Sequence, residues 1–547
     1  MTITTSTKSL NVIIDDDKKV QSLNEVIDIE STHSGVDEIF GEEKRLNRGL
    51  KQRHIQMLAL VGVFGTGLFL SSGTTLYLTG NVGMFLSYLF VGALVGLNQL
   101  ANIELSCFVP LTSATVRQTE HFIDESYGFA LGWIQVYAGL MPGELAATAL
   151  VMHYWSDLNP AVWLSIFIVI IVALNSYSIR FYGEVEFGFG CLKILLITGL
   201  ILLSVIIDLG GVPKIDRIGF RYWKESPFKA KYKLGSAGKF LAWWKASSST
   251  IYAFGGISSI SFFGGETRNP RRAIYVAGKR IFYRVFVLYI LTVLGLTLIL
   301  SSKDSAIASP TGDATGSPFV IAIERAGIKG LPSIINALVL SSAFSAANLS
   351  MVHTSRNLFA LASKGQAPRI FLKTNKRGLP YYGVILAGIF MPLSYMNVSS
   401  GSSTVFGWFQ SLTSSNLLIG WISISLSHIG LQRALKAQGY TRNDLPYTMP
   451  YAHVGAYILL FFFVILLLTG GFPNFIKGHF AIGSFFSSYF SIAYFAVFYI
   501  FWKIWKRTKF IEPTEVDLQS LFIKVQETPE PPAEPLKGWK VLTLLWS

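Results

Sequence analysis

The chain has 547 residues, of which 51% are hydrophobic and only 14% are charged. A soluble protein carries roughly 25% charged residues, so this composition excludes an ordinary set of soluble domains. The net charge of +14 comes from Lys and Arg that lie between apolar stretches, which argues against nucleic acid as a partner. Apolar stretches long enough to cross a hydrocarbon layer of about 30 Å recur along the chain. The sequence therefore predicts a protein that crosses a lipid bilayer several times.

Residues 1–50 form an acidic tail without periodicity, which we expect to be disordered. Residues 51–510 are expected to form the transmembrane domain and residues 511–547 a polar C-terminal tail. The spans are too long and too evenly apolar for barrel strands, so an all-α fold of about twelve transmembrane helices is predicted. The expected spans are 55–78, 82–109, 127–153, 161–180, 184–208, 240–262, 281–302, 332–361, 381–397, 404–430, 452–471 and 480–503.

The charges of the short connections predict that both termini are cytoplasmic. Lys and Arg cluster before the first span and after the sixth, eighth and tenth spans, whereas residues 79–81 and 397–403 carry no charge. One connection contradicts this orientation. The loop 213–238 would lie outside, yet it is strongly basic and contains Lys214, Arg217, Arg221, Lys224, Lys229, Lys231 and Lys233.

Glycines interrupt the first and the sixth spans. The first contains Gly62, Gly65 and Gly67, and the sixth contains Gly255 and Gly256. Glycine costs a helix interior about 1 kcal/mol relative to Ala, so these clusters favour unwound segments. Unwound segments at membrane depth can bind a carboxylate through N–H groups and an ammonium through carbonyls. Interruptions at matching places of two five-helix halves indicate an inverted-repeat transporter. Close helix packing through small residues is the alternative.

Sequence signals for catalysis or nucleotide hydrolysis are weak. The nearest approach to a phosphate-binding loop is residues 235–239, but Phe240 follows where Ser or Thr would have to bind magnesium. No spacing typical of a metal site or of a nucleophilic Ser is present. We therefore expect a secondary transporter rather than an enzyme, without cofactor or metal.

Charged residues inside the spans are candidate functional groups. Glu144 follows Pro142 in the third span, and an intramembrane carboxylate is costly enough to indicate substrate contact or proton handling. A structural hydrogen bond between helices is the alternative. At the start of the fifth span, Arg180, Glu184 and Glu186 form either a salt-bridged gate or a solvated cluster at the inner mouth. Lys193, about two turns further on, is a candidate for a buried charge.

Several motifs occur in one order along the membrane region. They include Gly65-Thr66-Gly67-Leu68-Phe69, Pro142-Gly143-Glu144-Leu145, Phe181-Tyr182-Gly183-Glu184-Val185-Glu186-Phe187 with Lys193, and Asn269-Pro270-Arg271. Together they resemble the fungal amino-acid permease family of the amino acid–polyamine–organocation superfamily. The resemblance covers about residues 45–510. It implies a leucine-transporter-like fold of two inverted five-helix repeats with two peripheral helices.

The resemblance also implies a function and a site. Members of the family import amino acids with protons across the plasma membrane. The main chain around Gly65, Thr66 and Gly67 would then hold the substrate carboxylate. Carbonyls around Phe254, Gly255 and Gly256 would hold its ammonium, with the Phe254 ring as a gate.

One departure from the family pattern keeps a second hypothesis open. Ser258 stands where the family usually has Glu, which removes a carboxylate expected at the site. The alternative is therefore an amino-acid sensor that binds substrate and signals with little or no transport. Ser258, Thr413, Ser415 and Asn416 describe a polar, uncharged cavity, which favours neutral amino acids. In the N-terminal tail, Lys8, Lys18, Lys19 and Lys44 are candidate sites for ubiquitin, a solvated tail without a partner being the alternative.

Overall fold

The computed structural model describes residues 62–530 except 112, 141, 178, 213–215, 259–260, 262–268, 309–316, 377 and 401. It does not describe the side chains of residues 179, 180, 399, 400, 402 and 403. The expected disordered tail, with its candidate ubiquitin sites, and residues 531–547 lie outside the described part of the chain. Within that part, the regular elements are all helices.

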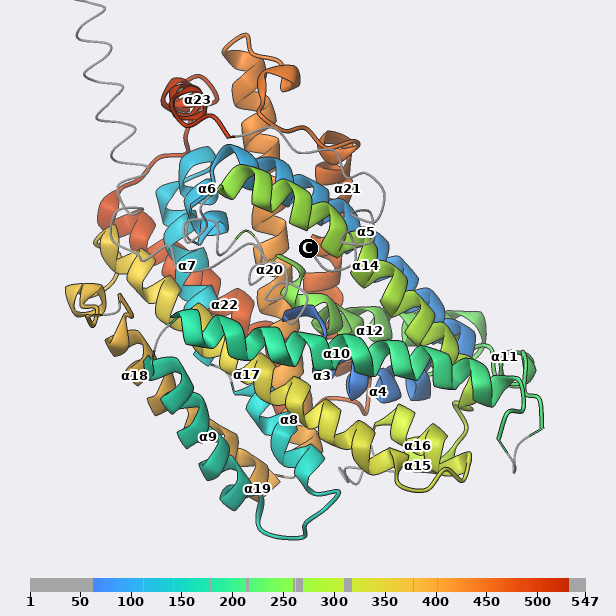
Figure 1. Cartoon of the computed structure of the whole chain (residues 1–547). Coiled ribbons are helices and arrows are strands. Elements are labelled where there is room, and N and C mark those ends of the chain that lie inside the picture. Colours follow the sequence, from blue (N-terminus) through green and yellow to red (C-terminus); the bar gives the residue numbers. More distant parts are fainter. Residues whose placement is uncertain are drawn as a thin grey trace, which may run out of the picture.

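The helices follow one another along the whole described chain (Figure 1). The first half contains α3 (Thr66–Phe69), α4 (Ser71–Thr79), α5 (Asn81–Phe108), α6 (Ala114–Phe122), α7 (Glu125–Leu140), α8 (Gly143–Met152), α9 (Pro160–Tyr177), α10 (Ile179–Asp208), α11 (Arg221–Glu225), α12 (Gly235–Thr250) and the 3-10 helix η2 (Ile251–Ser258). The second half contains α14 (Pro270–Ile299), α15 (Ser305–Ala308), α16 (Pro318–Arg325), α17 (Leu331–Ser363), α18 (Tyr381–Phe390), α19 (Met396–Ser400), α20 (Ser402–Ala437), α21 (Ala452–Thr469), α22 (Ile482–Lys506) and α23 (Leu518–Glu527).

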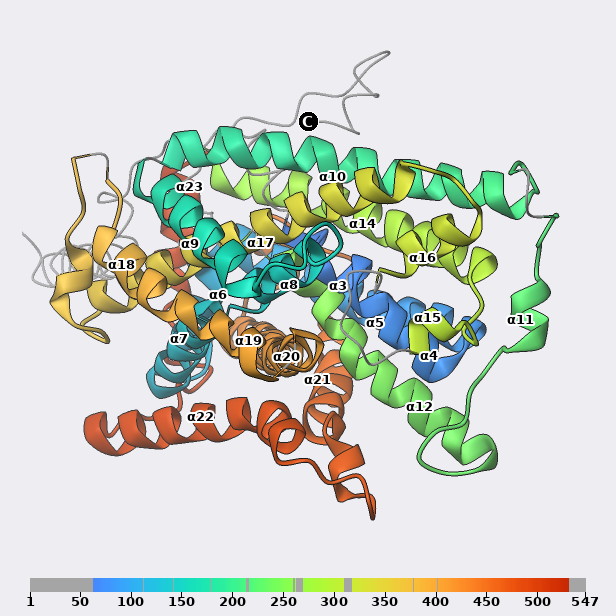
Figure 2. The same ribbon diagram turned by 90° about the horizontal axis from the view of Figure 1, so that it is seen from below.

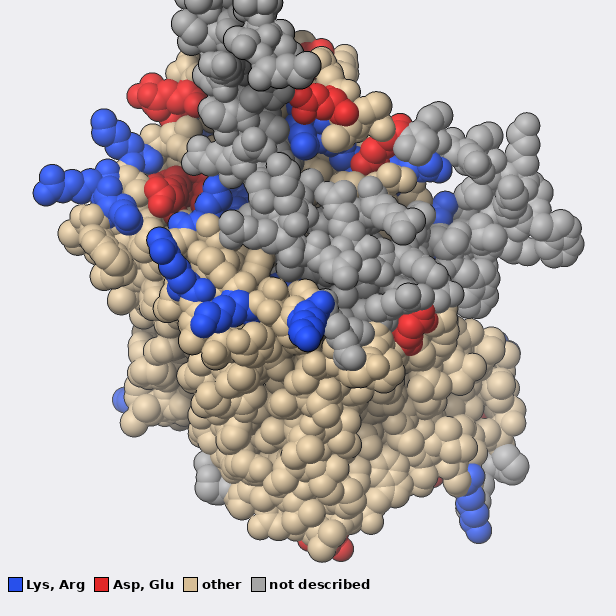
Figure 3. All heavy atoms as spheres, turned by 60° about the vertical axis from the view of Figure 1, so that its left-hand side comes forward, with Lys and Arg blue, Asp and Glu red and all other residues tan. Residues whose placement is uncertain are grey.

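Nine stretches among the described residues are long and apolar enough to cross a membrane. They are Asn81–Phe108, Glu125–Met152, Pro160–Tyr177, Phe181–Asp208, Pro270–Ile299, Leu331–Ser363, Tyr381–Val398, Ala452–Thr469 and Ile482–Lys506. The other three predicted spans correspond to α3 with α4, to α12 with η2, and to the serine-rich α20. Figure 3 shows a broad band without charged side chains on one face. The predicted all-helical, multi-pass membrane fold is confirmed.

Helices at equivalent places of the two halves pack against each other. Helix α5 packs along α14, α7 and α8 along α17, and α9 against α18, while α4 packs against α12. Each partner is the counterpart expected five spans later, as two inverted repeats require. The two remaining long helices, α21 and α22, lie at one side of the bundle (Figure 2), where they contact α20. The predicted repeat architecture with two peripheral helices describes this arrangement.

The first span is interrupted where its glycines predicted an interruption. Residues 62 and 63 are helical, Phe64 and Gly65 are irregular, and α3 begins at Thr66. The sixth span differs from the expectation. It does not unwind at Gly255 and Gly256 but tightens from the α-helix α12 into the 3-10 helix η2. In a 3-10 helix each carbonyl accepts from the N–H group three residues on instead of four. The hydrogen bonds of the main chain therefore change partner but are not lost over a whole turn.

The basic loop 213–238 is fixed to the start of α5. The N–H groups of Asn81, Val82 and Gly83 donate to the carbonyls of Ser226 and Pro227 at 3.0–3.1 Å. These are N–H groups that the first turn of a helix cannot satisfy internally. The loop therefore acts as a backbone cap for α5.

Candidate functional site

The two interrupted spans cross in direct backbone contact. A Cβ atom on Gly67 would lie 2.5 Å from the Cα of Ala253, and one on Gly256 would lie 2.0 Å from the carbonyl group of Gly62. Both distances are shorter than any side chain tolerates, so glycine is required at both positions by the close approach. Close packing, the alternative explanation of the glycines, therefore applies to Gly67 and Gly256.

A cavity of about 250 Å³ lies beside this crossing, and we call it the central cavity. It is lined from the first and sixth spans by Gly62, Gly65, Gly67, Gly255, Gly256 and Ser258. Further walls come from Glu144 on α8, Leu349 and His353 on α17, and Thr413 and Asn416 on α20. The structure thus brings together most of the site residues predicted from the sequence. Thr66 and Phe254 are not among the lining residues.

Glu144 connects three spans at the wall of this cavity. It lies in the first turn of α8, directly after the break at Pro142. Its Oε2 accepts a hydrogen bond of 2.8 Å from the Thr66 hydroxyl, and its Oε1 accepts one of 2.7 Å from the Tyr252 hydroxyl. The two hydroxyls lie 3.1 Å apart. The carboxylate is therefore hydrogen-bonded to both interrupted spans at once.

Tyr252 was missed in the sequence analysis. It lies in an apolar stretch and looks like a core aromatic residue. The one available signal was its hydroxyl, because a buried tyrosine usually needs a polar partner. In the structure that partner is Glu144, and the Tyr252 ring also meets the ring of Phe406 at a centroid distance of 6.1 Å.

Phe254 does not occupy the position expected of a gate. Its ring packs against Tyr289 at a centroid distance of 4.8 Å and against Tyr88 at 6.2 Å, within the hydrophobic core. Tyr289, also missed from the sequence, places its hydroxyl 2.7 Å from the carbonyl of Val63 and 2.6 Å from that of Ala253. Its one hydroxyl hydrogen is therefore shared between main-chain carbonyls of both interrupted spans.

The acidic residues Glu184 and Glu186 of α10 differ in burial. Glu186 is fully buried and accepts hydrogen bonds of 2.6 Å from Ser345 and Asn348 on α17. Glu184 is exposed, and the side chain of Arg180 is not described. The expected solvated cluster is therefore wrong for Glu186, while the salt-bridged gate of Arg180 and Glu184 stays a prediction. Lys193 is buried at 1% exposure and attracts both Glu186 and Glu144 electrostatically.

Two polar side chains of the central cavity have no hydrogen-bond partner within the described structure. These are Asn416, through both its Oδ1 and its Nδ2, and Ser258, through its Oγ. Asn416 is 5% exposed. Buried polar groups are rarely left unsatisfied, so both side chains are available to a polar ligand or to water.

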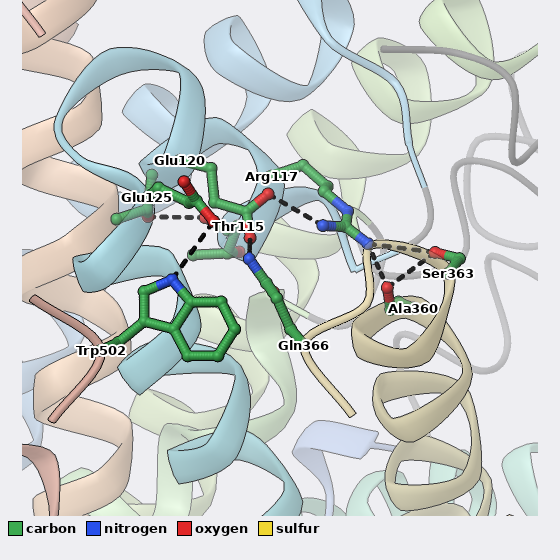
Figure 4. A network of polar contacts seen from close by, with 9 residues as sticks. Thr115, Arg117, Glu120, Glu125, Ala360, Ser363, Gln366 and Trp502 are labelled. Atoms are coloured by element: carbon green, nitrogen blue, oxygen red, sulfur yellow. Dashed lines mark hydrogen bonds and ion pairs between the residues drawn. The ribbon is translucent and has the colours of Figure 1, made fainter. Parts of the chain in front are cut away.

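A polar network fixes one end of the cavity wall (Figure 4). Arg117 on α6 pairs with Glu120 at 2.8 Å and donates to the carbonyl of Ala360, near the end of α17. Gln366 donates to Glu120 at 2.8 Å. Because Ala114 and Thr115 at the start of α6 line the central cavity, this network holds that wall against α17.

The fold and this cavity define a multi-pass membrane permease built from inverted repeats. The family model "Amino acid permease" matches residues 54–513. The chain is 38% identical to the dicarboxylic amino acid permease of Saccharomyces cerevisiae over 488 residues, which are 87% of this chain and 80% of that protein. It is 38% identical to the proline-specific permease of Emericella nidulans over 490 residues, 87% of this chain and 88% of that protein. To the lysine-specific permease of Saccharomyces cerevisiae it is 34% identical over 490 residues, 88% of this chain and 79% of that protein. The chain belongs to the amino-acid permease family, as its motifs indicated.

Proposed function

We propose that this protein is a secondary active transporter that imports L-amino acids across the plasma membrane together with protons. The observation that carries the proposal is the contact of Glu144 with both Thr66 and Tyr252 at the wall of the central cavity. A transporter has to change the contacts of its interrupted spans as substrate passes. Glu144 is the group through which a proton can influence those contacts.

The backbone groups at the crossing provide the substrate site in this proposal. The substrate carboxylate binds beside the main chain of Gly65 and Gly67, and its ammonium binds near the carbonyls of Gly255 and Gly256. All four glycines line the central cavity. Ser258 and Asn416, which lack partners, are placed to contact the substrate side chain.

Protonation of Glu144 changes its bonding. As a carboxylate it accepts from two hydroxyls, and hydrogen bonds to an ionised acceptor are stronger than neutral ones. A protonated carboxyl group has to donate one hydrogen bond, so one of the two hydroxyls must turn from donor to acceptor. The link between α8 and the interrupted spans then weakens. Among the described residues that line the central cavity, Glu144 is the only acidic residue.

The names of similar permeases support amino acids as the substrate class. They specify dicarboxylic amino acids, proline and lysine, respectively. Amino acids are therefore common to the three, while the side chain differs. For the orientation, Lys and Arg gather toward the end of the molecule that carries α6 and α23 on the face seen in Figure 3. By the positive-inside rule this end faces the cytoplasm.

Uptake of labelled amino acids by cells that express the protein, with and without an uncoupler, tests this proposal. We expect accumulation that the uncoupler abolishes. Glu144→Gln should lose accumulation, whereas Glu324→Gln, which alters an exposed carboxylate of α16, should keep it. Accumulation that is insensitive to the uncoupler would contradict proton coupling.

Ser258 favours the second candidate function, an amino-acid sensor. It supplies a hydroxyl where the family usually has a carboxylate, so the site has one acidic group fewer for coupling. A sensor would bind amino acids in purified form but would not accumulate them in a transport-deficient host.

A further inference from the structure

A second, larger cavity of about 610 Å³ lies next to the central cavity along α12 and α20, and we call it the vestibule. On α20 the vestibule is lined by residues between Thr404 and Leu418, and the central cavity by residues between Thr413 and Ile424. The rings of Tyr252, which lines the central cavity, and Phe406, which lines the vestibule, pack together where the two cavities adjoin.

The vestibule is basic. Lys231, Lys245 and His479 line it, and no Asp or Glu occurs among its described lining residues. A cleft with low-dielectric walls and charges of one sign concentrates ions of the opposite sign. An amino acid without a charged side chain brings its ammonium into this cavity with no acidic partner. An amino acid with a second carboxylate is attracted through its net negative charge.

Lys245 is part of a set of groups suited to a carboxylate. Its ammonium donates one hydrogen bond of 2.8 Å to the carbonyl of Gly470, and an ammonium has three donors. Ser248, one turn further along α12, also lies beside Gly470. A Cβ atom on Gly470 would be 3.4 Å from the Ser248 Oγ. The hydroxyls of Ser71, Ser248 and Ser414 are buried, line the vestibule and have no partner within the described structure.

The basic loop 213–238 supplies the other vestibule lysine. The ammonium groups of Lys229 and Lys231 lie over the ring of Tyr77, at 4.8 and 5.3 Å from its centroid. Because the loop is fixed to the start of α5 through Asn81, its positive charge is held at this end of the molecule. The loop whose charge conflicts with the predicted orientation thus places Lys231 at the vestibule.

We propose that the vestibule is a carboxylate-binding site that selects amino acids with an acidic side chain before they reach the central cavity. The proposal rests on the transport function proposed above and names acidic amino acids as its substrate class, in place of the neutral amino acids expected from the uncharged residues of the sequence. Lys245 and Ser248 bind the carboxylate, and Lys231 adds to the attraction. In the central cavity, the unpartnered donors of Asn416 and Ser258 then take the side-chain carboxylate.

The test compares L-glutamate with L-glutamine, which has nearly the same shape but no side-chain charge. Equilibrium binding of each to the purified full chain in lipid nanodiscs gives a ratio of dissociation constants. We expect glutamate to bind at least about 10-fold more tightly, a difference of about 1.4 kcal/mol, and increasing salt should reduce this preference. Equal binding, or tighter binding of glutamine, would overturn the proposal.

The variant Lys245→Gln separates selection from a structural role. We expect the glutamate preference to fall at least fivefold in Lys245→Gln and to be restored in Lys245→Arg. The control is Lys239→Gln, an exposed lysine of the same helix, which should keep the preference. A preference that survives in Lys245→Gln would contradict the proposal. Because these readouts measure binding, failure to transport any amino acid would overturn the proposed function without deciding this inference.

Discussion

The hydroxyl of Tyr252 donates a hydrogen bond of 2.7 Å to the carboxylate of Glu144, and this contact joins η2 to α8 across the wall of the central cavity. The tyrosine lies on one interrupted span, while the other interrupted span reaches the same carboxylate through Thr66. Residues far apart in the sequence thus meet at one ionisable group. In our account, protonation of this group changes the contacts that hold the interrupted spans in position.

Tyr252→Phe should reduce transport while the protein still folds. The substitution leaves the carboxylate without one of its two side-chain donors, and a hydrogen bond to a charged group contributes about 1.5–3 kcal/mol. We expect the initial rate of uptake in proteoliposomes to fall by about 10-fold or more. Tyr283→Phe changes an exposed tyrosine of α14 and serves as the control. Unchanged uptake in Tyr252→Phe would argue against the role of this contact.

Gly256→Ala should disrupt the crossing of the first and sixth spans. The added methyl group would lie 2.0 Å from the carbonyl of Gly62, where backbone rather than a flexible side chain has to move. Overpacking of this kind costs about 1–3 kcal/mol or more, so we expect lower thermal stability and loss of uptake. Gly199→Ala is the matched control, because no atom lies within 4 Å of its added methyl group. A stable, active Gly256→Ala protein would show that the spans do not need this close approach.

Two ion pairs should differ in their effect on stability. Arg117 is buried and binds Glu120 and the end of α17, so Arg117→Ala leaves Glu120, whose side chain is 13% exposed, without its ion-pair partner. We expect a loss of about 3 kcal/mol, measured by unfolding of the purified protein. Arg325 pairs with Asp304 but is 57% exposed, so Arg325→Ala should cost less than about 1 kcal/mol. Equal losses would contradict the assignment of Arg117 to the buried network.

Acid should lower the stability of the native protein through the buried His121. Burial lowers the pKa of His121, on α6, below its usual value of 6.5, although Asp517 counters part of the shift. The unfolded chain then binds a proton more readily than the native protein as the pH falls through 6.5, so native stability declines there. His121→Gln should lose less stability between pH 7.5 and pH 5 than the unchanged protein in thermal unfolding. An identical decline in both would show that His121 does not contribute.

The sequence predicted the helical spans and the interruption at Gly65 because apolar length and glycine content are local properties. It did not predict which way the rings of the sixth span face. All sides of that segment are apolar enough to be buried, so periodicity does not distinguish Tyr252, which reaches Glu144, from Phe254, which packs in the core. The difference between buried Glu186 and exposed Glu184 likewise depends on partners in α17.

The C-terminal segment also depends on tertiary contacts. Its polar composition suggested only a tail, yet α23 packs Leu518 and Leu521 into the core. Glu530 accepts hydrogen bonds of 2.9 and 2.6 Å from the N–H groups of Arg271 and Arg272, at the start of α14. The N–H groups at the start of α14 thus find their acceptor far away in the sequence. No local sequence pattern predicts such a contact.

Substrate-driven proton entry into proteoliposomes tests the central claim most directly. A pH-sensitive dye inside the vesicles reports acidification when an accumulated amino acid is added outside. Our account predicts acidification with the unchanged protein and with Glu324→Gln, and none with Glu144→Gln. Amino-acid accumulation without acidification, or acidification that persists in Glu144→Gln, would contradict the assignment of proton coupling to Glu144.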